Sequence, residues 1–362
     1  MARKDVGTWL LILVAMVFVT VVLGGLTRLT GSGLSMVDWQ PITGWLPPAS
    51  DAQWQAVFDL YKTSPQYHEV NFDITVDGFK SIFWLEYIHR LWGRIIGVVF
   101  IVPFGYFTLR GRITGRLVPR IGILFVLGAL QGVIGWLMVA SGLENAPEVS
   151  QYALAAHLGA ALLIYAYMLW EGLSLWRPDG FAPVAPEHKA LATATTWVLA
   201  LIALTMIAGA FVAGTHAGFI YNTFPLMEGG LYPDGSFRDG IAPFVDPGTV
   251  QFDHRLLAES TFVAVIVLWL RARKRLPEGP ARLAYDAMGT MVLIQFTLGI
   301  ATLLSVVAIP LASLHQAGAF ILFTLTMAAR HWLRGAAPLP ERPKPLEREP
   351  FLEYKSANSK GS

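Results

Sequence analysis

Four of the eight histidines recur at matched places along the chain. His89 and His254 are each followed by an arginine, and His157 and His315 come later at similar spacings. Each half of the chain thus offers two imidazoles from different apolar segments, which can bind a planar metallocofactor from both faces inside a helical bundle. A single such histidine is explained as well by an interfacial hydrogen bond. Duplication in matched pairs favours metal ligation.

Arginines accompany the first histidine of each pair. Arg90 and Arg255 directly follow His89 and His254, and Arg94 lies one helical turn after Arg90. Guanidinium groups at the rim of a site can bind carboxylates through paired hydrogen bonds, and the propionates of a heme are such carboxylates. We therefore predict that Arg90, Arg94 and Arg255 bind the cofactor. An equal alternative is that they only extend to the membrane surface.

One carboxylate distinguishes the two halves. Glu86 lies three residues before His89, on the same helical face, whereas the matching position before His254 is Gln251. A carboxylate beside only one of the two sites predicts that this first site carries out chemistry and that the second serves electron transfer or structure. The alternative is an ion pair between Glu86 and Arg90, four residues apart, without any catalytic role.

The composition restricts where these residues can lie. Of 362 residues, 54% are hydrophobic and only 14% are charged, against about 25% charged in ordinary soluble domains. The chain contains no cysteine, which excludes disulfides, iron–sulfur clusters and thiolate-bound heme. A formal net charge of +2 gives no support for a nucleic-acid partner. The sequence predicts a membrane protein whose metal ligands are histidines.

The apolar runs have the length of membrane-spanning helices, for which about 20 residues are needed. None shows the alternation of a barrel strand, so we predict an all-α integral membrane protein with eight spans. The first run has no small-residue cleavage site after it and is read as a retained span. The predicted spans are 9–26, 82–109, 121–140, 152–175, 191–213, 256–270, 288–308 and 311–333.

Several segments of the two halves can be superimposed. Residues 25–41 align with 209–225 at an offset of 184, and the segment containing His89 aligns with that containing His254 at 165. Each half would hold four helices that cross the membrane in the same sense, giving two pseudo-symmetric four-helix bundles with parallel repeats. A transporter built on repeats is disfavoured, because the matched residues lie near one membrane surface rather than at the midplane.

Most of the 27 lysines and arginines fall in the termini and in every second connection. The positive-inside rule then places both termini in the cytoplasm and the histidines towards the outer side. We predict a first bundle over 1–180, a second over 181–335, and a disordered cytoplasmic tail over 336–362, which is rich in proline and charge.

The remaining polar candidates have weaker support. His216 aligns with Ser32 and is predicted to be a loop hydrogen-bonding residue, while three other histidines have no counterpart and are read as structural. Gln131 and Gln295 match each other within apolar runs, where a hydrogen bond between helices explains an amide. Ser50 and the apolar spacing after it predict a short helix at the membrane surface. The three structural histidines are His68, His188 and His331.

Taken together, these motifs resemble the heme A synthase family, the membrane enzymes that mature heme for cytochrome c oxidase. The resemblance runs from about residue 8 to 333, and the chain is similar to the cysteine-free branch of proteobacteria and mitochondria. The motifs are GGLTRLTGSGLS (24–35), Glu86-x-x-His89-Arg90, His157, THAG (215–218), FDHR (252–255) and LHQ (314–316).

The resemblance implies an activity and a division of roles. Enzymes of this family oxidise the C8 methyl of heme O to a formyl group by successive hydroxylation, giving heme A. It implies that His89 and His157 hold the substrate heme, that Glu86 takes part in catalysis, and that His254 and His315 bind heme b. The expected surroundings are a bacterial inner membrane, heme O synthase, oxidase assembly factors and an unidentified electron donor or acceptor. A homo-oligomer is compatible with the sequence.

Two bound imidazoles leave an iron no open position for oxygen, so either one ligand leaves or electrons are removed before water attacks. We favour the second route, with Glu86 accepting a proton. The competing function is a diheme cytochrome b that only transfers electrons and never modifies its porphyrins.

Overall fold

The computed structural model describes residues 2–40, 43–144, 147–176, 183–233 and 242–335. The tail over 336–362, predicted to be disordered, lies outside this described part. In the described residues the secondary structure is helical, with two isolated β-bridges and no strand. The long helices are α1 (Ala2–Leu29), α4 (Val76–Leu109), α5 (Leu117–Glu144), α6 (Gln151–Trp176), α7 (Lys189–Gly214), α9 (Pro247–Arg275), α10 (Pro280–Leu304) and α11 (Ile309–Trp332). The short ones are α2 (Asp51–Tyr61), α3 (Pro65–Glu69), η1 (Pro186–His188), η2 (Ala217–Phe219) and α8 (Ala242–Val245).

Seven of the long helices in the described residues are long and apolar enough to cross a membrane. The protein is therefore a helical, multi-pass membrane protein. The exception is α9, which has 29 residues but carries Asp253, Arg255 and Glu259 in its first half and a basic cluster at its end. Helix α9 is long enough to cross a membrane, and it is not among the seven because of these charged residues.

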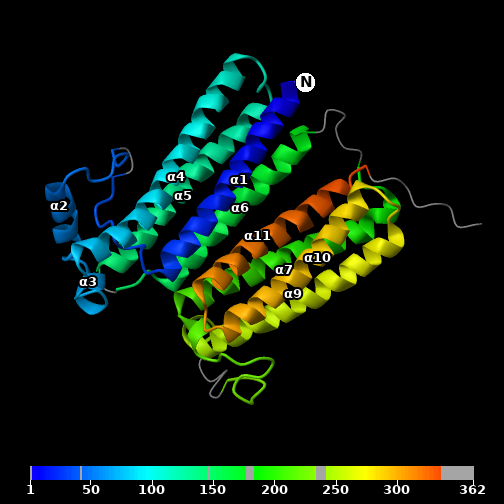
Figure 1. Ribbon diagram of the computed structural model, residues 1–362. Helices are drawn as coiled ribbons and strands as arrows, with labels where there is room; N and C mark the ends of the chain where they lie inside the picture. Colours follow the sequence, from blue (N-terminus) through cyan, green and yellow to red (C-terminus); the bar gives the residue numbers. More distant parts are fainter. Residues whose placement is uncertain (1, 41–42, 145–146, 177–182, 234–241, 336–362) are drawn as a thin grey trace, which may run out of the picture.

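The long helices gather in two groups of four (Figure 1). In the first, α1 packs on α4 and α6, and α5 packs on α4 and α6; in the second, α7 packs on α9 and α11, and α10 packs on α9 and α11. The groups meet through α1, α6, α7 and α11. Hydrogen bonds between Tyr165 and Thr324 (2.6 Å) and between Ser174 and His331 (3.1 Å) join α6 to α11.

The apolar run predicted as a span over 288–308 does not form one helix. Helix α10 ends at Leu304, and the turn that follows contains Val306 and Val307 with φ of 54° and 60°. Left-handed backbone is unusual for β-branched residues. The turn was invisible to the hydrophobicity pattern because every residue in it except Ser305 is apolar.

The segment between α1 and α4 packs against the first turns of α4. The predicted helix is present as α2, with the Ser50 hydroxyl accepting a hydrogen bond from the Gln53 N–H. Its apolar face does not lie open to the membrane, because it is buried against aromatic residues of α4. The resulting cluster of buried residues contains Trp54, Phe58, Tyr61, Phe79, Phe83 and Tyr87.

The structure corrects the register of the first repeat. Gly31 and His216 both adopt left-handed backbone, with φ of 64° and 55°. Gly24 faces His89 just as Gly209 faces His254. Both equivalences have an offset of 185, not 184, so His216 matches Gly31 and not Ser32. The error arose because the pairing was judged by residue type, whereas the shared property is the backbone conformation.

Candidate functional site

The four matched histidines lie near one end of the two helical groups. His89 is on α4, His157 on α6, His254 on α9 and His315 on α11. His89 lies within electrostatic interaction range of His157, and His254 lies within range of His315. The structure thus brings the predicted pairs together, one pair in each group of helices.

Each of these imidazoles packs against a glycine on a neighbouring helix. A methyl group at Gly24 would lie 3.0 Å from Cε1 of His89, and one at Gly135 would lie 2.9 Å from Cε1 of His157. The second half repeats the arrangement: a methyl group at Gly209 would lie 3.2 Å from Cε1 of His254, and one at Gly299 would lie 2.9 Å from Cε1 of His315. The four glycines create the room that the rings occupy, since any larger residue would displace them.

Polar atoms around the rings lack partners in the described part of the structure. Nδ1 of His89 and of His254 is buried without a hydrogen bond, and so is Oε1 of Gln131 and of Gln295. Buried polar groups without partners are rare and call for an explanation. Two imidazoles brought together from different helices inside a helical group fit a heme, whose iron is commonly held by histidine.

Glu86 is held by three donors. Its Oε2 accepts hydrogen bonds from the Ser35 hydroxyl (2.6 Å) and the Met36 N–H (2.8 Å), and its Oε1 pairs with Arg90 at 2.5 Å. Only 2% of Glu86 is exposed. The ion pair between Glu86 and Arg90 is therefore present, and two donors from the segment after α1 add to it. The carboxylate is fixed one turn of α4 before His89.

The second half replaces the carboxylate with an amide. Gln251 is equally buried; its amide donates to the Ala217 carbonyl at 2.8 Å, and its Oε1 accepts from Arg255 at 3.1 Å. The amide therefore ties the corresponding loop, after α7, to the corresponding helix, α9, without a buried carboxylate. The difference between the halves is chemical and not architectural.

The three predicted arginines donate hydrogen bonds to carbonyl groups in the segments that follow α1 and α7. Arg90 donates to Met36 O (2.9 Å) and Asp38 O (3.4 Å), and Arg94 donates to Gln40 O (2.5 Å). In the second half, Arg255 donates to the carbonyls of Tyr221 and Thr223 (2.6 and 2.9 Å), while its buried Nε has no partner. These residues fasten the loops over the histidines, and binding of a cofactor carboxylate by them stays a prediction.

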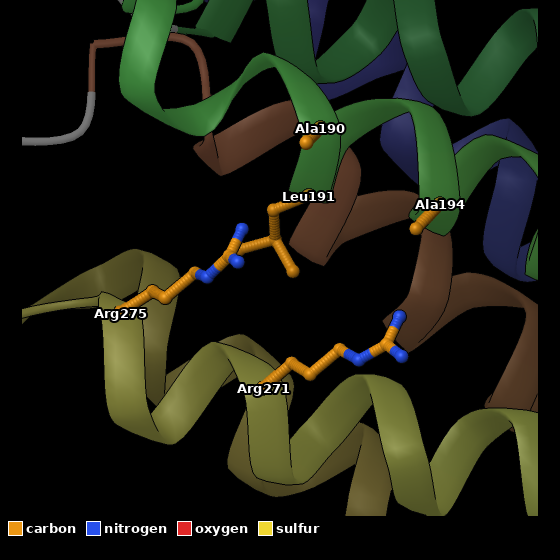
Figure 2. A pocket seen from close by; sticks show the side chains of 5 residues that line it. All are labelled: Ala190, Leu191, Ala194, Arg271 and Arg275. Carbon is orange, nitrogen blue, oxygen red and sulfur yellow. The ribbon is translucent and has the colours of Figure 1, made fainter.

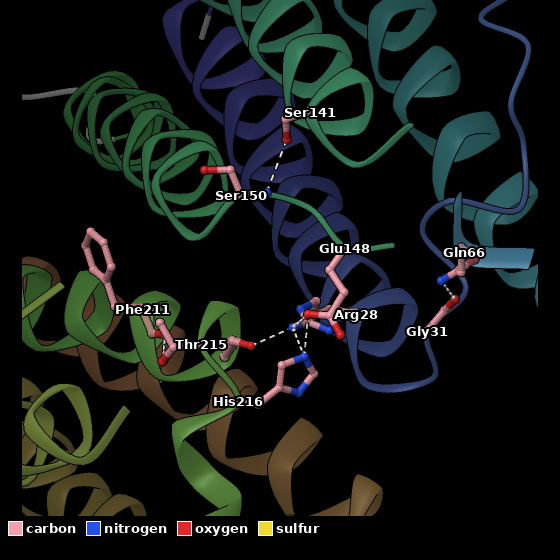
Figure 3. A network of polar contacts seen from close by, with 10 residues as sticks. Arg28, Gly31, Gln66, Ser141, Glu148, Ser150, Phe211, Thr215 and His216 are labelled. Atoms are coloured by element: carbon pink, nitrogen blue, oxygen red, sulfur yellow. Dashed lines mark hydrogen bonds and ion pairs between the residues drawn. The ribbon is translucent and has the colours of Figure 1, made fainter. Parts of the chain in front are cut away.

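A polar group that the sequence did not reveal joins the two halves (Figure 3). Arg28, at the end of α1, donates to the Ala213 carbonyl at 2.8 Å, and its Nη2 lies 3.4 Å from Glu148. Nε2 of His216 lies 2.9 Å from Arg28 and 2.5 Å from Glu148. His216 is thus a loop hydrogen-bonding residue, as expected. The feature of the sequence that could have pointed to this group is Arg28 itself, a charged residue at the end of an apolar run.

The other histidines lie apart from the pairs. His68 is in α3 beside Tyr67, and His188 and His331 are buried at the opposite end of the long helices. A cavity of about 150 Å³ also lies at that end, between the start of α7 and the end of α9 (Figure 2). Its lining residues are Ala190, Leu191, Ala194, Arg271 and Arg275. It is remote from the paired histidines.

Fold and site together define a helical membrane protein with a duplicated histidine-pair site. Residues 7–327 match the family described as cytochrome oxidase assembly protein, and the chain belongs to this family. The chain is 49% identical over 335 residues to the heme A synthase of Paramagnetospirillum magneticum, covering 91% of this chain and 94% of that protein. It is 48% identical to the heme A synthase of Granulibacter bethesdensis (92% and 88% covered) and 44% identical to that of Arabidopsis thaliana (93% and 76% covered).

Proposed function

We propose that this protein is a heme A synthase, which oxidises the C8 methyl of heme O to a formyl group and so produces heme A. The observation that carries the proposal is the buried Glu86 beside one of two otherwise matching histidine pairs. Family membership and the shared name of close relatives over nearly the whole chain support it.

The two sites have different roles in this proposal. His89 and His157 hold heme O as the substrate, next to Glu86, and His254 and His315 hold a resident heme b. The histidine pairs and the glycines that face each ring support heme binding in both halves. Heme b supplies one-electron transfer when bound.

The chain's own residues position the substrate and handle protons. Converting a methyl to a formyl group with one water releases four electrons and four protons, so an electron acceptor must take part. Glu86 is held by Ser35, Met36 and Arg90 at a fixed place, where it can accept a proton as water adds to the oxidised carbon. The buried Arg90 compensates the charge of this carboxylate at the same time.

We place the protein in a bacterial inner membrane with eight spans, which are the seven apolar helices and α9. The first bundle covers 1–180 and the second 181–335, with the substrate site in the first. Both termini are cytoplasmic and both heme sites face the outer side. The basic clusters at the end of α9 and of α11 support this orientation. Heme O synthase and oxidase assembly factors are the expected partners.

Analysis of extracted porphyrins tests the function. Purified protein from cells that make heme O should contain heme O, a hydroxylated intermediate or heme A together with heme b, and conversion should stop at heme O in Glu86→Gln. General-base catalysis typically contributes about 10²–10⁴-fold, so a loss of this size is expected while both hemes remain bound.

Glu171→Gln is the matched control, since Glu171 is also buried and paired with an arginine (Arg120, 2.6 Å) but lies about 20 Å along α6 from His157. Its conversion rate should stay near that of the unmodified protein. Two unmodified b-type hemes in every preparation would instead identify an electron-transfer cytochrome, and normal conversion by Glu86→Gln would remove the catalytic role.

A further inference from the structure

The cavity between the start of α7 and the end of α9 has one basic wall and one apolar wall (Figure 2). Arg271 and Arg275 extend from α9 towards α7, which contributes only Ala190, Leu191 and Ala194. The cavity volume of about 150 Å³ is about ten times what a single water molecule needs. A charged group of several atoms therefore fits between the two guanidinium groups.

The two arginines of the cavity have no anionic partner among the described residues. They lie four positions apart on one face of α9, an arrangement in which like charges repel each other. Arg273, between them in sequence, pairs with Asp286 at 3.5 Å, whereas no described carboxylate lines the cavity. Two adjacent guanidinium groups without a counter-charge favour an anion, and the phosphate group matches their hydrogen-bonding geometry.

The first half of the chain neutralises the corresponding place by itself. Asp5, in the first turn of α1, accepts a hydrogen bond from Arg112, just after the end of α4, at 2.6 Å. Under the corrected offset of 185, Asp5 corresponds to Ala190, which lines the cavity. The second half thus has arginines but an alanine in place of the carboxylate. An anion from outside the chain completes the charge balance there.

Exposed apolar side chains lead from the cavity along both helices. Trp197, 73% exposed, lies three residues after Ala194 on the same face of α7. On α9, Val267 and Val263 lie four and eight residues before Arg271, and they are 40% and 59% exposed. In a membrane, such faces contact acyl chains. The arrangement therefore suits an occupant that has both an anionic group and apolar chains.

We propose that this cavity binds the head group of an anionic phospholipid, with its phosphate between Arg271 and Arg275 and its acyl chains along the exposed faces of α7 and α9. Basic pockets between membrane helices on the cytoplasmic side bind such head groups, and the cavity lies at the basic end of the helices. The bound lipid joins the start of α7 to the end of α9. This site is separate from the histidine pairs and does not depend on the proposed enzymatic function.

Lipid titration of the full-length protein tests the site. Delipidated protein in detergent is mixed with phosphatidylglycerol, and the bound lipid is counted by native mass spectrometry. The double variant Arg271→Gln/Arg275→Gln should bind the tightest lipid about 30-fold more weakly, about fivefold for each arginine. Phosphatidylcholine with the same chains has no net negative charge, so its weaker binding should be equal in both proteins.

Two further variants separate the site from general attraction to basic residues. Arg110→Gln/Arg116→Gln removes the same charge from the same end of the first half, where both side chains are exposed, and it should bind phosphatidylglycerol like the unmodified protein. Ala190→Asp keeps both arginines and supplies the carboxylate that the first half has at this position. It should weaken lipid binding without removing any basic residue.

Two results would overturn the proposal. Equal affinities of the two double variants for phosphatidylglycerol would show that only the total charge of the basic end matters. Displacement of phosphatidylglycerol by an equal concentration of inorganic phosphate would show a site for a free anion, in which the apolar faces of α7 and α9 play no part. We expect inorganic phosphate to leave the bound lipid in place.

Discussion

Two contacting residues of the first half, Glu86 and Ser35, both have counterparts of a different type in the second half, where Glu86 is matched by Gln251. Under the corrected offset of 185, Ser35, which donates to Glu86, corresponds to Ile220. The first half therefore has both a buried carboxylate and a hydroxyl directed at it, and the second half has neither. A purely structural loop anchor requires no such pair, since Gln251 bonds its loop with an amide alone. The paired difference favours a chemical role for the carboxylate.

We expect Ser35→Ala to impair conversion without removing heme. The carboxylate loses one of three donors and its position loosens, and small displacements of reacting groups are costly. A fall in the conversion rate of about tenfold corresponds to the loss of one hydrogen bond to a charged group, worth about 1.5 kcal/mol. Porphyrin analysis over time measures it.

Ser32→Ala is the control for this prediction. Ser32 is a buried hydroxyl in the same loop that bonds Thr30 at 2.7 Å and does not contact Glu86. Equal rates in both variants would show that the Ser35 hydroxyl does not support the carboxylate.

Two glycines on one helix give a matched test of the histidine pocket. Gly135→Ala places a methyl 2.9 Å from Cε1 of His157, whereas Gly132→Ala meets nothing within 4 Å. Both changes favour the helix by about 0.5–1 kcal/mol, so a difference between them reports the contact with the ring. We expect Gly135→Ala to lower the heme content of the first site and Gly132→Ala to leave it intact. The absorption spectrum per protein measures both, and equal heme contents would contradict the prediction.

At the level of elements, the turn between α10 and α11 stores backbone strain near the second histidine pair. Val306 and Val307 have positive φ, a conformation that costs about 1–2 kcal/mol for an ordinary residue. The side chain of Val307 packs over Gly218 in the loop after α7, whereas 51% of Val306 is exposed. The turn is therefore strained at one residue that packs and at one that does not.

Val306→Gly should raise the free energy of unfolding by about 0.5–1 kcal/mol, which is the relieved strain less the flexibility of glycine. Val306→Ala removes the same exposed side chain but keeps the strained conformation, so it should give no gain. Thermal unfolding in detergent compares the two variants. Equal stability of both would show that the left-handed backbone at Val306 carries little strain.

The sequence predicted eight spans, seven of which form helices apolar enough to cross a membrane, together with the approach of the histidines in pairs and the capped helix after Ser50, because hydrophobicity and helical spacing act locally. It missed what depends on backbone conformation or on distant contacts. The left-handed turn at Val306 lies within an apolar run, and the pairing of Arg28 with Ala213 joins helices more than 180 positions apart. The repeat register failed for the same reason, since Gly31 and His216 share a conformation but no chemistry.

At the scale of the whole molecule, some contacts between the two halves lie directly beside the histidine pairs. Gln316 of α11 bonds Val21 O of α1, and a methyl at Gly25 would collide with the Gln316 amide at 1.9 Å. Arg28 bonds Ala213 close by. Because Gln316 follows His315 and Gly25 follows Gly24, the two sites are held relative to each other by residues adjacent to their own pockets.

The absence of cysteine makes the membrane orientation testable with single cysteines. Leu46 is 87% exposed in the loop before α2, Leu109 is 90% exposed at the other end of α4, and Glu278 is exposed in the turn between α9 and α10. With eight spans, Leu46→Cys should react with a membrane-impermeant maleimide in right-side-out vesicles. Leu109→Cys and Glu278→Cys should react only in inside-out vesicles.

Glu278→Cys decides whether α9 crosses the membrane, since α9 is the helix whose charges exclude it from the apolar spans. If α9 stayed on the outer side, Glu278→Cys would react in right-side-out vesicles together with Leu46→Cys. Helix α9 packs on both α7 and α10, which argues against a position outside the membrane. In addition, the polar residues Gln251 and Arg255 in the first half of α9 already have hydrogen-bond partners. Labelling of Glu278→Cys from the inner side alone would establish that α9 crosses the membrane despite its charged residues.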